Sequence, residues 1–181
     1  MVKYIALLRG INVGGKNSIS MKELKAAFEE NGFANVATYI NSGNVLFDCA
    51  QTDEVLLAAR CEEVIEKKFG IPVRVAVFAA EKLREAIAHA PSWWGDAPDE
   101  KHNAIFVIPP VSAAEIVAEV GDIKPEYEKL DVYESVIFWS ASIKHFSRTR
   151  WSRIVGTNAY RHVTIRNANT ARKLSELVSV R

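Results

Sequence analysis

The glycine-rich segment that follows the first apolar run has the composition of a phosphate-binding loop. Gly10 to Asn17 reads GINVGGKN and satisfies the spacing G-x-x-x-x-G-K. Nucleotide hydrolases follow that lysine with serine or threonine, whose hydroxyl binds magnesium, whereas here Asn17 follows Lys16. The next helix is also expected to begin near Ser20, so its N-terminus is misplaced for a phosphate held by Lys16. The pattern therefore argues against an ATPase.

A simpler anion site stays open at this loop. Backbone N–H groups of glycines after a strand can point together at one anion. The candidate ligands are Arg9, Asn12, Gly14, Gly15 and Lys16. The alternative is that the glycines only turn the chain between a strand and a helix. If the protein is an enzyme acting on a small phosphorylated metabolite, the pocket would be formed by Arg9, Asn12, Lys16 and Asn44.

Charge is distributed unevenly along the chain. The 181 residues include 23 basic and 22 acidic ones, a formal net charge of +1. Residues 143–181 contain nine basic residues against the single acid Glu176, a charge of +8, which leaves −7 for residues 1–142. A basic segment of this kind either packs on the acidic part of the chain or attracts an anionic partner. Both interpretations stay open.

Aromatic residues are interleaved with these cations, a composition typical of surfaces that bind single-stranded nucleic acid. There, cations follow the phosphates and rings stack on bases. The candidate anion-binding residues in this segment are Arg148, Arg150, Arg153, Arg166, Asn167 and Asn169. The arginines would supply charge and the asparagines would orient the anion through hydrogen bonds. The aromatic motif that RNA-recognition domains carry on a central strand is absent, and Trp151 is more typical of a core residue than of a binding surface.

Other chemistry finds no support in the residue types. The four histidines lack metal-ligand spacing, and Cys49 and Cys61 are too few for a disulfide scaffold or a zinc site. No serine lies in a G-x-S-x-G motif. No run approaches the ~20 apolar residues that a membrane helix needs, and the N-terminus lacks a signal-peptide pattern. We expect a cytoplasmic, non-catalytic protein without metal or cofactor, whose oligomeric state the sequence leaves open.

The elements that position the loop form a ferredoxin-like pattern. Ser20 and Glu23 have the spacing of a helix capping box, and Gly32 is expected to end that helix in a left-handed conformation. Thr52 is expected to cap a second helix that ends at Gly70. The predicted strands are Val2–Leu8, Val36–Ile40, Val45–Phe47 and Val73–Val77. The resulting order β-α-β-β-α-β defines a ferredoxin-like unit.

The second half of the chain repeats this pattern less regularly. Its predicted strands are Ala104–Ile108, Leu130–Tyr133, Val136–Trp139 and His162–Ile165, and its predicted helices are Glu81–Ala90, Ser112–Val120, Arg148–Val155 and Thr170–Val178. We therefore predict an α+β fold of two tandem ferredoxin-like (βαββαβ-type) units, residues 1–79 and 80–181. Trp93 and Trp94 in the connector either plug the seam between the halves or form a partner patch, which would make the protein an interaction module.

Two stretches resemble a known family. The N-terminal run LLRGINVGGKNSISMKELKAAFEENGFANVATYINSGNVLF closely resembles a bacterial family catalogued as domain of unknown function 1697. The C-terminal run TIRNANTARKLSEL is similar to the closing signature of that family, except that Ala168 stands where a tryptophan is usual. The resemblance implies two ferredoxin-like units and carries no established activity. A contact made by that tryptophan in relatives would be lost here.

Overall fold

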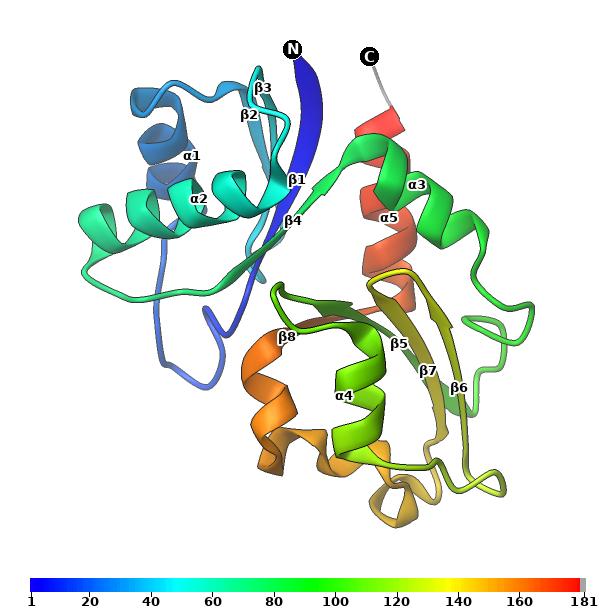
Figure 1. Cartoon of the computed structure of the whole chain (residues 1–181). Coiled ribbons are helices and arrows are strands. Elements are labelled where there is room, and N and C mark those ends of the chain that lie inside the picture. The colour runs from blue at the N-terminus through cyan, green and yellow to red at the C-terminus, as the bar shows by residue number, and fades with distance from the viewer. Residues whose placement is uncertain (180–181) are drawn as a thin grey trace. The chain divides into compact units, whose positions relative to one another are not determined.

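The computed structural model describes residues 1–179 and has the α+β architecture that the sequence predicts (Figure 1). Contacts between residues divide the chain into two units. The first comprises Met1–Arg84 and the chain from Leu174 onward, and the second comprises Glu85–Lys173. Each unit contains one four-stranded antiparallel sheet.

The first unit has the predicted ferredoxin-like order. Its elements are β1 (Val2–Leu8), α1 (Met21–Glu30), β2 (Ala34–Tyr39), β3 (Asn44–Cys49), α2 (Glu54–Phe69) and β4 (Val75–Ala79). The sheet order is β2-β3-β1-β4, so β1 lies between β3 and β4 and pairs antiparallel with both. Strand β2 forms one edge of the sheet.

Local signals in the sequence place the ends of both helices. The hydroxyl of Ser20 caps α1 as predicted, and Gly32 follows that helix with φ +82°. Helix α2 is capped by Asp53 instead of Thr52, and the Asp53 carboxylate accepts two backbone N–H groups of the first turn. A carboxylate also interacts favourably with the positive end of the helix dipole, which a hydroxyl does not. Gly70 ends α2 in the left-handed conformation.

Helices α1 and α2 share an apolar core with one face of the first sheet. Phe33 packs between Phe28 and Phe47, with ring centroids 5.0 and 4.7 Å apart, and Tyr4 stacks on Phe47 at 5.8 Å. Burial is the main reason that the pKa of Tyr4 is raised. Because side chains alternate along a strand, the neighbours of these residues lie on the opposite face of the sheet.

The second unit has the same strand order. Its strands and α-helices are α3 (Ala80–Ala88), β5 (Glu100–Val107), α4 (Ala113–Val120), β6 (Glu128–Tyr133), β7 (Val136–Ser142), β8 (Val163–Asn167) and α5 (Ala168–Ser179). The sheet order is β6-β7-β5-β8, which matches the first sheet strand for strand. Helices α3 and α5 each have residues in both units. Ser112 and Glu115 form the capping box predicted at the start of α4.

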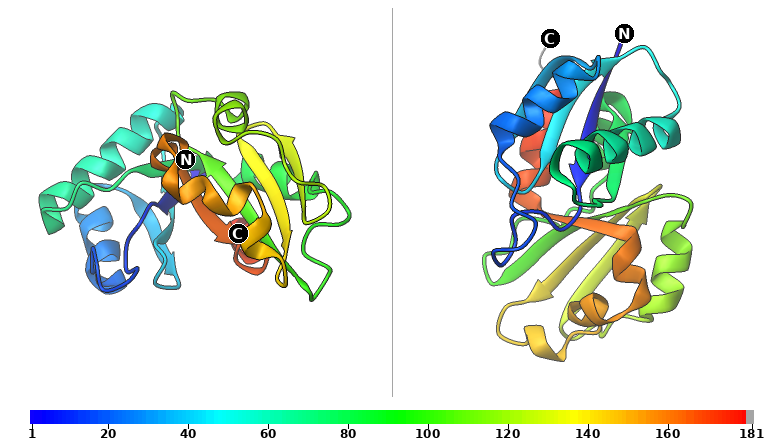
Figure 2. Two further views of the ribbon diagram at one scale, coloured as in Figure 1. Left: turned by 90° about the horizontal axis from the view of Figure 1, so that it is seen from below. Right: turned by 90° about the vertical axis from the view of Figure 1, so that its left-hand side faces the viewer.

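Three 3-10 helices replace the second helix of the ferredoxin-like pattern. They are η1 (Phe146–Arg148), η2 (Trp151–Gly156) and η3 (Asn158–His162). Of these, η2 and η3 lie beside α4 (Figure 2). The single helix predicted over Arg148–Val155 is therefore wrong. Thr149 is extended between η1 and η2, and its hydroxyl donates to the carbonyl of Phe146 at 2.7 Å. Such side-chain bonds compete with the hydrogen bonds of an α-helix.

The connector before β5 contributes an aromatic side chain to the second unit. Trp94 is 1% exposed, contacts Phe138 edge to face at a centroid distance of 5.0 Å, and donates from Nε1 to the carbonyl of Asn103 at 2.8 Å. The guanidinium of Arg172 lies 5.3 Å from the Trp94 ring. Trp94 is thus a core residue of this unit, whereas Trp93 is half-buried.

Candidate anion-binding sites

The 3-10 segment and the loop before it, residues 143–162, form what we call the basic segment. Its cations are exposed and have no carboxylate partner among residues 1–179: Lys144, Arg148, Arg150, Arg153 and Arg161. The interpretation that this charge is neutralised by acidic residues of the same chain does not hold for these five side chains. Their charge is available to an anion in solution.

A buried carboxylate holds the start of η2 in place. Glu128, which is 2% exposed, accepts four N–H groups. Its Oε1 accepts the backbone N–H groups of Lys124 at 2.9 Å and Arg150 at 2.6 Å. Its Oε2 accepts the Nε1–H of Trp139 at 3.0 Å and the backbone N–H of Trp151 at 3.1 Å. All four donors satisfy one buried charge, which makes the backbone of the basic segment rigid at this point.

Aromatic rings lie beside the cations at the N-terminal end of the segment. The ammonium of Lys101 lies 4.3 Å from the centroid of Phe146, and the guanidinium of Arg148 lies 6.0 Å from that of Tyr127. His145 contacts Tyr127 with centroids 5.1 Å apart. The three rings are half-buried, so each is held in place and leaves part of its surface to solvent. Trp151, in contrast, is fully buried.

Arg166 does not belong to this exposed set. Its side chain is 6% exposed and donates to the Thr164 hydroxyl at 2.8 Å and the Ile165 carbonyl at 2.9 Å. Burial lowers the pKa of Arg166 to about 10, so the guanidinium still carries its charge at neutral pH. The sequence predicted a surface cation here, and the structure places it inside because strand β8 turns this side chain inward.

The start of α5 lies beside two acidic residues, Asp96 and Glu100, and Asp96 is paired with Arg172 at 3.5 Å. Asn167 caps the helix, since its Oδ1 accepts the backbone N–H of Thr170 at 2.8 Å. A cavity of about 410 Å³ lies here, and its lining residues include Asp96, Glu100, Ala168 and Asn169. The two predicted asparagines therefore lie next to carboxylates. Ala168, at the place where the resembling family usually has tryptophan, is 4% exposed and lines this cavity.

The glycine-rich loop forms a small hairpin. Val13 and Lys16 form a β-bridge, and Gly14 and Gly15 between them have φ of +58° and +74°. Such a two-residue turn needs positive φ at both positions, which glycine adopts without strain. The turning role that the sequence offered as the alternative therefore explains both glycines. In this turn the backbone N–H groups of Gly14 and Gly15 have no acceptor among residues 1–179.

The polar side chains predicted at this loop have separate positions. Asn12 ties the loop together, because its amide accepts from the N–H of Ile19 and donates to the carbonyls of Ile19 and Asn41. Lys16 is exposed and lines an open cavity of about 560 Å³ with Asn12, Gly15 and Met21, the first residue of α1. Arg9 and Asn44 are not among the lining residues, and Asn44 is fully buried.

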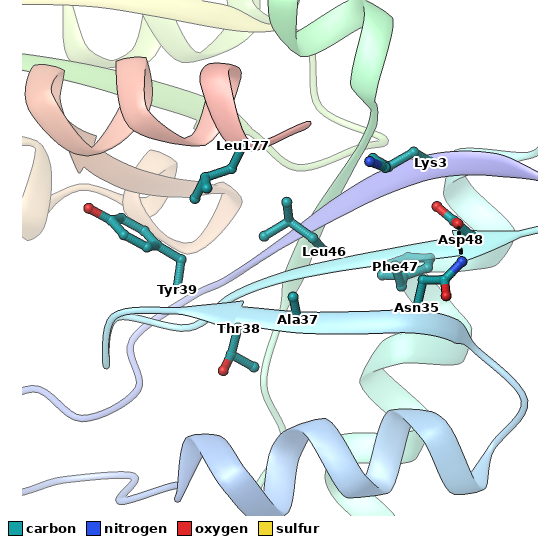
Figure 3. A pocket seen from close by; sticks show the side chains of 9 residues that line it. All are labelled: Lys3, Asn35, Ala37, Thr38, Tyr39, Leu46, Phe47, Asp48 and Leu177. Atoms are coloured by element: carbon teal, nitrogen blue, oxygen red, sulfur yellow. Dashed lines mark hydrogen bonds between the residues drawn. The ribbon is translucent and has the colours of Figure 1, made fainter. Parts of the chain in front are cut away.

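Two features of the molecule have no counterpart in the sequence analysis. One is Glu128, whose sequence position at the start of a strand is ordinary for an acid and whose role appears only from its four hydrogen-bond donors. The other is a cavity of about 600 Å³ on the first sheet, next to β2 (Figure 3). The alternation of polar and apolar residues along β2 and β3 is a weak signal for it.

No group of three metal-binding side chains occurs within residues 1–179, nor does a helix there have the length and apolar content to span a membrane.

Two sheets of identical strand order, one with α-helices and one with 3-10 helices in the second helical position, define an α+β protein of two ferredoxin-like units. The chain belongs to the family described as Protein of unknown function (DUF1697), whose model matches residues 1–138. It is similar to the solved structure of conserved bacterial protein SP0830 from Streptococcus pneumoniae, with 28% identity and a TM-score of 0.87 over 98% of this chain and 99% of that one. Comparison with curated proteins gives no match.

Proposed function

We propose that the protein binds single-stranded nucleic acid on the basic segment. The observation that carries this proposal is the set of five exposed cations without a carboxylate partner in residues 1–179. Unpaired surface charge of one sign attracts a polyanion and is tolerated where a partner neutralises it. In this proposal the protein is a non-catalytic, cytoplasmic binding protein.

The aromatic side chains favour a single strand over a duplex. Tyr127, His145 and Phe146 are half-buried beside Arg148 and Lys101. Unstacked bases can lie on such rings while the phosphates contact the arginines, an arrangement worth roughly 1–3 kcal/mol per stacked base. Arg166 and the two asparagines play no direct part in this proposal, because Arg166 is buried and the asparagines lie beside carboxylates.

The test is the binding of labelled single-stranded RNA and DNA across a series of salt concentrations. Each phosphate neutralised on a single strand contributes about 0.7 to the slope of log K against log salt. Arg150→Glu/Arg153→Glu should weaken binding and reduce that slope by about 1.4 if each arginine contacts one phosphate. Lys68→Glu/Arg84→Glu makes the same change of charge on exposed residues of the first unit and should leave binding nearly unchanged.

Three results would overturn the proposal. One is the absence of binding at low salt. Another is equal competition by inorganic polyphosphate of the same charge, because polyphosphate has no bases and would show that the rings contribute nothing. The third is equal loss of affinity in the two double variants, which would show that total charge matters and that the basic segment has no special role.

A second candidate is a small phosphorylated molecule at the glycine-rich loop, as a ligand or as a substrate. The open cavity beside Lys16 is also lined by Ser18, Ser20 and Met21, the first residue of α1. The N–H groups of Gly14 and Gly15 are unbonded within residues 1–179. Phosphorylated metabolites should raise the melting temperature of the protein, and Lys16→Glu should abolish that rise. The absence of any shift would exclude this site.

A further inference from the structure

Strand β6 forms an edge of the second sheet, and no strand within residues 1–179 pairs with its outer side (Figure 1). Backbone groups of an antiparallel strand point alternately toward the neighbouring strand and away from it. The N–H of Ser142 donates to the carbonyl of Tyr127 at 2.8 Å, which fixes the phase of the ladder between β6 and β7. In that phase, the backbone N–H and carbonyl groups of Leu130 and Val132 point outward, away from β7.

These outward backbone groups are only partly satisfied. Neither the N–H nor the carbonyl of Leu130 has a hydrogen-bond partner within residues 1–179. The N–H of Val132 donates to Oδ1 of the adjacent residue Asp131 at 2.9 Å, so a side chain of the same strand occupies it. An edge strand with open backbone groups can pair with another extended chain.

The side chains of β6 carry both signs of charge on one face of the sheet. Lys129 and Asp131 are exposed and lie two residues apart, so they are on the same side of the strand. Asp131 forms no salt bridge within residues 1–179. The ammonium of Lys129 contacts the carboxylate of Glu100 at 2.9 Å, and its side chain is 46% exposed. Because an ammonium has three donors, Lys129 can bind a second carboxylate without leaving Glu100.

The other edge strands lack this arrangement of charges. The edges of the two sheets are β2 and β4 in the first and β6 and β8 in the second. Strands β2 and β4 contain no charged residue, and the charge of β8 is that of the buried Arg166. Among these four strands, β6 is therefore the one whose charges a copy of itself would complement.

We infer that β6 binds β6 of a second copy of this chain in antiparallel orientation, with Leu130 of one copy opposite Leu130 of the other. In this register each Leu130 donates its N–H to the carbonyl of the other. Each Val132 N–H passes from Asp131 to the Glu128 carbonyl of the other copy. The carboxylate of Asp131 is then free to accept the ammonium of Lys129, which lies directly opposite it on the other copy. The same contacts occur twice by symmetry, as in an isologous dimer.

Charge selects this register over its neighbours. A shift of two residues in one direction places Lys129 opposite Lys129, and a shift in the other direction places Asp131 opposite Asp131. Like charges directly opposite each other destabilise a pair of strands. The inference is independent of nucleic-acid binding, since it uses the backbone and charges of β6 and none of the exposed cations of the basic segment.

The test is sedimentation equilibrium of the whole chain over a range of concentrations. Residues 128–132 of two copies form an interface smaller than the ~1,200 Å² of stable complexes, so we expect a weak dimer with a dissociation constant of about 10 µM to 1 mM. Asp131→Lys and Lys129→Asp each place like charges opposite each other. Each variant alone should therefore dimerise about tenfold more weakly than the original protein, because two attractive cross-strand pairs become repulsive.

A mixture of the two charge variants provides the sharpest measurement. Asp131→Lys in one copy and Lys129→Asp in the other again place a lysine opposite an aspartate at both contacts, so the equimolar mixture should form a heterodimer about as strong as the original dimer. Asp122→Lys and Lys68→Asp make the same changes of charge at exposed positions outside β6. As matched controls, they should leave the dimerisation of the protein unchanged.

Val132→Pro tests the backbone bonds of the dimer. The N–H of Val132 points outward, so proline removes no bond to β7 and is tolerated at this edge, yet it should abolish dimerisation while thermal unfolding stays cooperative. The inference is overturned if the original protein is still a monomer at about 1 mM. It is also overturned if Val132→Pro and the single charge variants dimerise as strongly as the original protein, or if the mixture associates no better than either charge variant alone.

Discussion

The backbone N–H of Arg150 donates to the buried carboxylate of Glu128 at 2.6 Å, across 22 residues of sequence. The bond attaches the main chain of the basic segment to strand β6 while the guanidinium of Arg150 stays exposed. One buried negative charge thus holds the backbone whose side chains carry positive charge outward. The proposed binding surface depends on Glu128 although Glu128 cannot touch a ligand.

Glu128→Gln should destabilise the protein by about 2–3 kcal/mol, since an amide can accept on one atom only and leaves two of the four N–H groups unbonded. Urea denaturation measures this as a lower midpoint with an unchanged slope. Glu126→Gln, an exposed neighbour, is the control and should stay within about 0.5 kcal/mol of the original protein. Equal stability of the two variants would show that the four bonds to Glu128 do not stabilise the fold.

Arg166 and Arg153 should respond differently to truncation. Arg166→Ala removes a buried side chain together with its bonds to Thr164 and the Ile165 carbonyl, so a loss of about 2–4 kcal/mol is expected. Arg153→Ala changes an exposed side chain and should cost less than about 0.5 kcal/mol. Thermal unfolding of both variants measures the difference. A melting temperature for Arg166→Ala within a degree or two of that for Arg153→Ala would contradict the buried position.

Gly43→Ala should be strongly destabilising. A Cβ at Gly43 would lie 2.7 Å from Cδ1 of Ile11 and 2.8 Å from Cβ of Leu8, in a backbone conformation with φ +83°. The left-handed conformation costs about 1–2 kcal/mol, and the overlap in a packed core adds about 1–3 kcal/mol. Gly14 has φ +58° and open space around a Cβ, so Gly14→Ala measures the cost of the left-handed conformation without the overlap. Equal losses in the two variants, measured in urea, would refute the close approach at Gly43.

Stability should fall above pH 9 in part because of Cys61. Burial is the main cause that raises the pKa of the Cys61 thiol far above its ordinary value of 9.0, so the thiol stays protonated in the folded protein. The unfolded chain releases this proton first, and its ionisation above pH 9 then favours unfolding by about 1.4 kcal/mol per pH unit. Below pH 9 both states are protonated and the contribution is constant.

Cys61→Ala removes that dependence while other titrating groups stay the same. The difference in unfolding free energy between the original protein and Cys61→Ala should be constant up to about pH 9 and then shift in favour of the variant. Urea titrations at about pH 7, 9 and 10.5, which cover the ionisation of the thiol in the unfolded chain, measure this difference. A difference that does not change with pH would mean that the thiol ionises as readily in the folded protein as in the unfolded chain.

Much of the fold is local in origin and was predicted for that reason. Ser20, Gly70 and the pair Ser112–Glu115 bond to atoms within about one turn of themselves, so their types and spacing are enough to place helix ends. The order of strands and helices in the first unit followed from such signals and was confirmed. Thr149 shows the limit, because its hydroxyl breaks a segment whose apolar spacing is typical of one helix.

The sequence by itself determined the α+β class, the order of the strands and the concentration of positive charge near the C-terminus, since composition and short-range spacing suffice for these. Only the tertiary structure decided which arginines face water. Arg150 and Arg166 are the same residue type in the same basic stretch of sequence, yet Arg150 is exposed and Arg166 is buried, with 6% of its surface exposed. The difference arises because the bonds of Glu128 to η2 and the inward face of β8 join residues far apart in the chain, and burial depends on those long-range contacts.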